Sequence, residues 1–269
     1  MAGMTLLLLV AALFLTPSAA RAHGTAGHAA DPNLHVDPSL EQCSVVFSPE
    51  LSQSAFRRFT REFGALSSFK QIAPPAPLGQ WDVAVGVQYA AFEVEEKSDA
   101  WNDTFAHPDD RHELGARQAF PKLELRLGVG GDTDLGVFYS ENPSANYGWV
   151  GVTAKHALLR EGEASPVGVS VAAAYTRTLY VEDMDLHDLT AAVSVGKSFW
   201  GVLTPYVGLG SDLVLARETT SAVELEPELA VVPHALAGLE LTPWTHLALG
   251  AELQVADVAS LQARVVAVF

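Results

Sequence analysis

The sequence is poor in cysteine, in positive charge and in long apolar runs. Its single cysteine, Cys43, excludes a disulfide within the chain. Lysine and arginine number 16 against 32 aspartates and glutamates, which gives a net charge of −16. This balance argues against nucleic acid as a partner, because nucleic-acid-binding surfaces are basic. Beyond residue 22, no apolar run approaches the roughly 18 residues that a membrane-spanning helix needs.

Apolar residues nevertheless make up 49% of the chain, and from residue 80 onward they alternate with small or polar residues. Val83, Val85 and Val87, for example, share one face of a segment that begins at Trp81. A period of two predicts β-strands. About ten such segments follow one another, at about 81–92, 119–129, 133–140, 147–158, 166–181, 186–199, 203–216, 228–241, 245–255 and 261–269. Eight or twelve strands stay open, because the fourth segment is irregular and Pro233 interrupts the eighth.

The second face of these segments favours a membrane barrel over a soluble sandwich. A sandwich wets one face of each strand, and that face should be rich in Lys, Glu, Thr and Arg. Here it is rich in Gly, Ala and Ser, with isolated charges, which suits a narrow barrel interior. The sequence therefore predicts an all-β fold, a transmembrane antiparallel up-and-down β-barrel over 80–269. A soluble lipocalin-like or sandwich fold is the alternative.

Charged residues on the second face should point into the lumen and pair there, since unpaired charges in a dehydrated interior are costly. Arg264 on the last strand faces two candidate partners, Glu240 and Glu252. The complete predicted lumen charge network is Lys122, Glu124, Arg126, Lys155, Asp188, Asp212, Glu240, Glu252 and Arg264.

Residues 1–22 are expected to be a cleaved secretory signal. Thr5 to Leu15 form a short apolar core, and the small-residue ending Ala20-Arg21-Ala22 provides an A-x-A cleavage site. The usual charged start is missing. The apolar core is too short to span a membrane as a helix.

Residues 23–79 are expected to form an N-terminal periplasmic segment. Its first part carries His23, His28 and His35 among Gly, Ala, Asp and Pro, a composition that predicts a disordered tail. Binding of Cu²⁺ or Zn²⁺ by these histidines is the alternative, although no spacing fixes a coordination geometry. A stiff linker with Pro74 and Pro75 ends the segment.

An amphipathic helix is predicted at about 49–63 within this segment. Ser48 is a candidate N-cap, and Gly64 a candidate end. One face carries Phe56, Phe59 and Phe63, and Arg57, Arg58 and Arg61 lie elsewhere. The helix could plug the barrel mouth, lie on the inner leaflet, dock on a periplasmic partner or pack on its own chain.

The last segment, Leu261 to Phe269, resembles the C-terminal strand of bacterial outer-membrane β-barrel proteins. In that class the final Phe is part of the signal that the barrel assembly machinery reads, so the resemblance implies this role for Phe269. It also implies a location in the bacterial outer membrane, with outer-membrane lipid and lipopolysaccharide as surroundings. An even strand number puts both ends in the periplasm and the long acidic connections outside. The resemblance is to the general class and assigns no specific family.

No GxSxG, P-loop or HExxH motif occurs, so the sequence predicts no catalytic site, no cofactor and no metal site. The leading hypothesis is a narrow pore for small solutes or a closed structural barrel. One alternative is an outer-membrane hydrolase with a site at the rim. Asp185 and His187 are its candidates, because residues two apart in a strand point the same way. Another is an adhesion or binding barrel that acts through its acidic loops.

Overall fold

The structure is a computed structural model that describes residues 43–68, 70, 73–106, 116–142, 145–181 and 183–269. The predicted signal peptide and the histidine-containing tail lie outside the described residues. No helix in the described ranges is long and apolar enough to cross a membrane.

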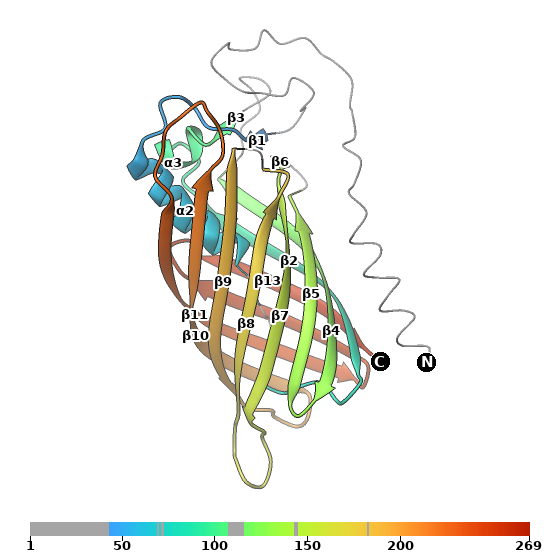
Figure 1. Ribbon diagram of the computed structural model, residues 1–269. Helices are drawn as coiled ribbons and strands as arrows, with labels where there is room; N and C mark the ends of the chain where they lie inside the picture. The colour runs from blue at the N-terminus through green and yellow to red at the C-terminus, as the bar shows by residue number, and fades with distance from the viewer. Residues whose placement is uncertain (1–42, 69, 71–72, 107–115, 143–144, 182) are drawn as a thin grey trace, which may run out of the picture.

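Ten antiparallel strands close into a barrel (Figure 1), and each pairs with the next along the chain. The strands are β2 (Val83–Glu93), β4 (Arg117–Gly130), β5 (Thr133–Glu141), β7 (Gly148–Leu159), β8 (Gly168–Leu179), β9 (Met184–Gly196), β10 (Leu203–Glu218), β11 (Glu228–Trp244), β12 (Leu247–Val255) and β13 (Ser260–Val268). The predicted up-and-down barrel of about ten strands is confirmed, and the strand bounds differ from the predicted ones by a few residues.

The last strand closes the barrel on the first. Val265 in β13 lies opposite Val87 in β2. The backbone N–H of Phe269 donates to Val83 O over 2.9 Å, and the N–H of Val83 donates to Phe269 O over the same distance. The sheet therefore has no free edge along this seam.

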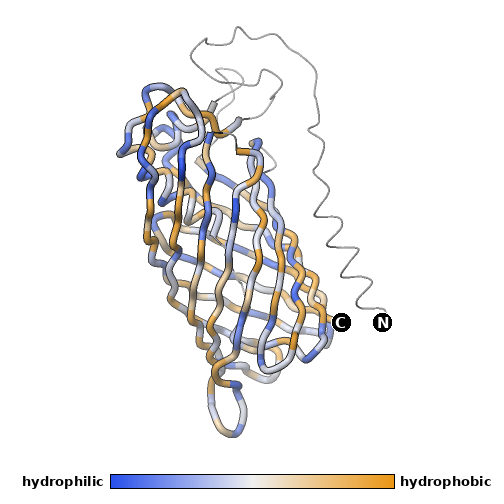
Figure 2. Tube along the Cα trace, viewed as in Figure 1, coloured by the Kyte–Doolittle hydropathy of each residue, from blue (hydrophilic) through white to orange (hydrophobic). Residues whose placement is uncertain are grey.

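Side chains alternate between an exposed outer wall and a buried interior. Along β2, Val85 and Val87 are 45% and 54% exposed, whereas Ala84 and Gln88 are 0% and 2% exposed. Figure 2 shows apolar positions along the length of the strands. An apolar outer wall on a closed sheet is the arrangement that a lipid bilayer requires of a β-structure.

Exposed aromatic residues mark one end of the barrel, which we call the Phe269 rim. They are Trp81, Trp200, Trp244 and Phe269, each at least 66% exposed. Amphipathic aromatic rings are enriched where a membrane protein crosses from lipid to water. This ring therefore marks one membrane boundary.

The N-terminal part of the described chain begins at the opposite end, which we call the β1 rim. Strand β1 (Cys43–Val45) pairs with β3 (Phe105–Ala106) and β6 (Ala145–Asn146), which lie in connections at that end. A short helix, α3 (Asp99–Asn102), belongs to the same connection as β3. The helix α2 (Gln53–Ser67) follows β1 and lies against β11, β10 and β9.

The predicted helix bounds, about 49–63, were wrong at both ends. The N-cap is Ser52, whose Oγ accepts the backbone N–H of Ala55 over 3.2 Å, whereas Ser48 opens a turn that precedes the helix. Gly64 does not end the helix. It lies against Val214 of β10, so close that an added Cβ would be 2.4 Å from a methyl carbon. Close helix–strand packing explains the glycine at this position.

After α2 the chain descends through the lumen and joins β2 at the Phe269 rim. The backbone N–H of Leu78 donates to Asp134 Oδ1 on β5 over 2.9 Å. Gly79 lies so close to Gly128 that a Cβ on Gly128 would be 2.1 Å from Gly79 O. We call the described residues from Val46 to Gly79 the plug.

The helix thus lies in the barrel and not in a separate segment, and β1 and Phe269 lie at opposite rims. The two expectations of a periplasmic N-terminal segment and a periplasmic C-terminus are therefore incompatible.

Candidate functional site: the plugged lumen

Aromatic side chains fill the half of the lumen next to the β1 rim, which we call the aromatic half. The ring centroid of Phe63 is 5.3 Å from that of Tyr147 and 6.1 Å from that of Trp149. The ring of Phe59 is 5.2 Å from Trp101. The aromatic side chains of this core are Phe47, Phe56, Phe59, Phe63, Phe92, Trp101, Phe105, Phe120, Phe138, Tyr147 and Trp149, and all are buried. One face of α2 is therefore part of a hydrophobic core that the barrel encloses.

The other face of α2 carries arginines that form ion pairs at the rim: Arg57 with Glu228 (3.1 Å), Arg58 with Glu95 (2.8 Å) and Arg61 with Asp257 (2.6 Å). Their side chains are 63%, 44% and 36% exposed. Such exposed pairs contribute at most about 1 kcal/mol each. The phenylalanines therefore fix α2 more strongly than its arginines do.

Helix α2 also covers a gap in the barrel wall. Strand β11 begins at Glu228, but its pairing with β12 begins only at Ala235 opposite Val255. Arg61 Nη1 donates over 3.2 Å to the backbone oxygen of Val231, in the part of β11 that pairs with β10 but not with β12. The helix thus satisfies part of a strand edge that β12 leaves uncovered.

Charged side chains fill the half of the lumen next to the Phe269 rim, which we call the ionic half. Glu124 Oε1 forms ion pairs with Arg126 Nε at 2.6 Å and with Arg264 Nη1 at 3.6 Å, and Arg264 also pairs with Glu240. The residues expected in the lumen, Lys122, Glu124, Arg126, Lys155, Asp188, Asp212, Glu240, Glu252 and Arg264, are all buried. Most of them take part in ion pairs or hydrogen bonds with one another or with the plug.

Asp134 on β5 belongs to the ionic half, although the sequence interpretation missed it. Its carboxylate lies 3.2 Å from Lys155 Nζ and accepts from the plug at Leu78 N. Lys155 also donates to the backbone oxygen of Ala76 over 2.6 Å. The period of two that puts Leu135 outside also puts Asp134 inside, so the signal was present in the sequence.

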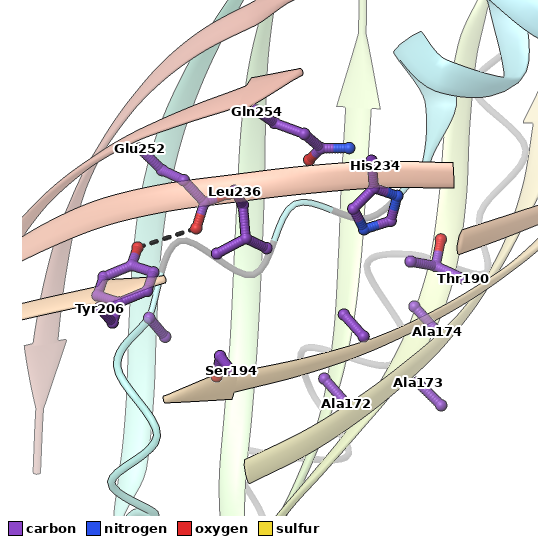
Figure 3. A pocket seen from close by; sticks show the side chains of 12 residues that line it. Ala172, Ala173, Ala174, Thr190, Ser194, Tyr206, His234, Leu236, Glu252 and Gln254 are labelled. Atoms are coloured by element: carbon purple, nitrogen blue, oxygen red, sulfur yellow. Dashed lines mark hydrogen bonds between the residues drawn. The ribbon is translucent and has the colours of Figure 1, made fainter. Parts of the chain in front are cut away.

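A second polar group lies between the two halves. Asp212 is 3.2 Å from His234 Nδ1. The hydroxyl of Tyr206 donates to Glu252 over 2.9 Å (Figure 3), so Glu252 binds Tyr206 and is not the ion-pair partner of Arg264. Lys70 of the plug is buried nearby and donates to Ala65 O over 2.6 Å. The sequence interpretation missed Lys70 because it lies in the linker, where no periodicity gives a direction.

Gly238 makes the Tyr206–Glu252 contact sterically feasible. Tyr206, Gly238 and Glu252 are opposite one another on β10, β11 and β12. A Cβ on Gly238 would be 2.2 Å from the tyrosine ring. The small residues of the inner face therefore let large polar side chains lie across their neighbours.

A cavity of about 20 Å³ remains beside this group (Figure 3). Its walls include Ala73 of the plug, Thr190, His234 and Glu252. This volume holds about one water molecule. No group of three or more His, Cys, Asp or Glu that could hold a metal ion occurs among the described residues.

Some buried oxygens in the lumen have no hydrogen-bond donor among the described residues. They include both carboxylate oxygens of Asp188, Oδ1 of Asp212 and Oε1 of Glu252. Buried polar atoms without a partner cost about 1–3 kcal/mol each, and more when the group is charged. This part of the lumen therefore holds buried carboxylate oxygens whose hydrogen-bonding capacity is unused.

Asp185 and His187, the candidates for a hydrolase, lie on the outer wall near the β1 rim. His187 Nε2 is 3.2 Å from Asp185 Oδ2, and its Nδ1 is 2.6 Å from the hydroxyl of Tyr175. The two residues are therefore on one face and in contact. They face away from the lumen, on the side of the barrel that carries apolar residues.

A scan against protein-family models and a search of curated proteins each gave no match. The chain is similar to solved bacterial outer-membrane β-barrels. It is 11% identical to the COG4313 outer membrane channel from Pseudomonas putida F1, with a TM-score of 0.42, over 72% of this chain and 97% of that one. It is 14% identical to Ail, the attachment invasion locus protein of Yersinia pestis, with a TM-score of 0.32, over 71% and 100% of the two chains. Similarity at this level identifies no activity, and the barrel assignment rests on the strand pairing and side-chain distribution described above.

Proposed function

We propose that this chain is an integral protein of the bacterial outer membrane, a β-barrel that its own plug keeps closed to solutes. The apolar outer wall, the ring of exposed aromatics at one rim and the sequence resemblance of the last strand support the location. The plug supports closure, since it runs from the β1 rim to the Phe269 rim inside the strands.

Burial of the luminal charges is the observation that carries closure. Arg126, Lys155 and Asp212 are 5%, 4% and 0% exposed although they point into the lumen. In a water-filled channel such side chains would be solvated, as they are in wide barrels. Solvent does not reach them here, so ions and solutes do not either.

A second candidate function, a gated path for small polar solutes, is favoured by the chemistry of the lumen wall. Replacing buried ion pairs by well-packed apolar residues is often neutral or stabilising, so a permanently sealed interior does not require them. Yet Asp188 and Asp212 keep oxygens without donors among the described residues. These groups would be hydrated if the plug were displaced, which is the state a conducting barrel needs.

Conductance in planar bilayers tests both candidates. The unmodified protein should show no steady current, because plug and wall fill the lumen. The double variant Phe59→Asp/Phe63→Asp should conduct, since two charges in the aromatic half expel α2. The matched control, Phe59→Leu/Phe63→Leu, keeps the helix face apolar and should stay closed.

Heat-modifiable migration on gels confirms beforehand that each preparation contains a folded barrel. Steady current through the unmodified protein would overturn closure. A closed Phe59→Asp/Phe63→Asp variant with an intact barrel would eliminate the gated path and leave the closed structural barrel.

A further inference from the structure

The outer wall of β8, β9 and β10 forms an apolar column that ends in a polar cluster. On β9 the column consists of Val195, Val193, Ala191 and Leu189, and the next two outward residues are His187 and Asp185. From Val195 to Asp185 the strand covers about 33 Å, which at a strand tilt of about 40° corresponds to the roughly 25 Å height of an apolar barrel band. The polar cluster therefore lies where the apolar part of the membrane ends, at the β1 rim.

Hydrogen bonds link four of the five residues of this cluster. Asp185 is central, 3.4 Å from Arg177 Nη2 and 3.2 Å from His187 Nε2. The ring of Tyr175 stacks on His187 at a centroid distance of 5.9 Å, and its hydroxyl is 2.6 Å from His187 Nδ1. With Arg217 on β10, these residues are called the rim cluster.

Arg217 completes a pair of guanidinium groups that flank Asp185. It lies directly opposite Asp185 in the β9–β10 register, and Arg177 lies opposite His187 in the β8–β9 register. Arg217 is exposed and forms no ion pair with any described residue, while the side chain of Arg177 is 56% exposed. Asp185 pairs with only one of the two arginines, so the positive charge of Arg217 is available to an anion.

We propose that the rim cluster binds the phosphate headgroup of a membrane lipid whose acyl chains lie along the apolar column. Guanidinium groups match phosphate oxygens in charge and in fork geometry. Leu189, Leu213 and Leu215 lie directly beside the cluster and are exposed to the same surroundings. An anion with acyl chains satisfies both surfaces together, which a free anion does not.

The chemical class of the lipid follows from the orientation and rests on the proposed function. If the Phe269 rim is periplasmic, the rim cluster lies in the outer leaflet, where the ligand is a phosphorylated glycolipid of the lipid A type. Asp185 positions Arg177 and His187 but competes with the phosphate for them. Removing its charge should therefore strengthen binding.

Native mass spectrometry of the folded protein in dodecyl maltoside, with diphosphoryl lipid A as the probe, tests the inference. The double variant Arg177→Gln/Arg217→Gln should bind lipid A at least about tenfold more weakly, since it removes two charge-assisted contacts. Asp185→Asn should bind about threefold more tightly, as expected from losing one exposed ion pair. The matched control, Arg160→Gln, removes an exposed arginine at the opposite rim and should leave binding unchanged.

Competition separates the lipid from a free anion. Inorganic phosphate at the concentration of lipid A should displace little lipid, because it cannot occupy the column. Equal displacement by phosphate, unchanged binding by the double arginine variant, or an equal loss in Arg160→Gln would each overturn the inference. Gel migration and bilayer conductance on the same preparations report on the closed barrel independently, so failure of the lipid site leaves that proposal intact.

Discussion

The aromatic half and the ionic half of the lumen are lined by the same ten strands, yet different chemistry fills them. In the aromatic half, Phe59 and Phe63 of α2 pack on aromatic rings of the surrounding structure. The hydrophobic effect, which is non-directional and scales with the buried apolar area, holds the helix there. In the ionic half, the plug is extended and thin, and it contacts the wall through Lys155 and Asp134. The two halves therefore stabilise different parts of the molecule. Aromatic packing holds the plug in place, whereas the ion pairs of the ionic half mainly connect strands of the barrel wall to one another.

The largest expected effect concerns which half faces the outside of the cell. Glu50, between β1 and α2, and Glu163, in the connection that extends beyond the Phe269 rim, are both exposed. With Cys43→Ser to remove the native thiol, Glu50→Cys should react fully with a membrane-impermeant maleimide on intact cells, and Glu163→Cys should not react. Permeabilised cells, in which both should react, are the control. Labelling of Glu163→Cys and not of Glu50→Cys on intact cells would show the opposite orientation, with the Phe269 rim facing outward.

A smaller effect is expected from Arg264→Ala, which leaves Glu124 and Glu240 buried without their shared cation. The free energy of unfolding of the barrel, measured by urea unfolding in detergent, should fall by about 3–5 kcal/mol. Glu240→Gln, which keeps a hydrogen-bonding partner for Arg264, should cost less. Protease resistance of the plug should change little in either variant if the ionic half holds mainly the wall. Release of the plug by Arg264→Ala would show that the ionic half also holds the plug, which contradicts the division between the two halves.

The smallest effect is expected at the exposed face of α2. Arg61→Ala removes an ion pair with Asp257 and one bond to Val231 O, and should cost less than about 1 kcal/mol in barrel stability. Hydrogen exchange of α2 should rise only modestly. Loss of protection throughout α2 would show that the rim arginines, and not the phenylalanines, hold the helix.

The strands could be predicted from the sequence because their signal is local. Each outward Val or Leu predicts its own direction, and the same period gives the inward direction of Arg264 and Asp212. The ion pairs themselves could be predicted only in part. Arg264, Gly250 and Glu240 lie in one row across β13, β12 and β11, and the glycine leaves that row open. Glu252 instead accepts a hydrogen bond from Tyr206. This contact depends on the register of β10, β11 and β12, which the sequence alone does not give.

The position of α2 could not be predicted, because its phenylalanines meet partners far away in the chain. Phe63 contacts Tyr147 and Trp149, which no local pattern connects to it. The same apolar face would suit a membrane surface or another protein. The N-cap is Ser52 and not the predicted Ser48, because the packed helix begins only at Gln53.

Passage of the plug through the lumen constrains the order in which the barrel can be assembled. The segment is held by β1 at one rim and continues into β2 at the other, so it cannot be added to a finished barrel without being drawn through an interior that side chains already fill. The seam between β13 and β2 must therefore form around residues that are already in place. The last strand of the barrel thus encloses the first described part of the chain, and closure of the wall and burial of the plug become a single step.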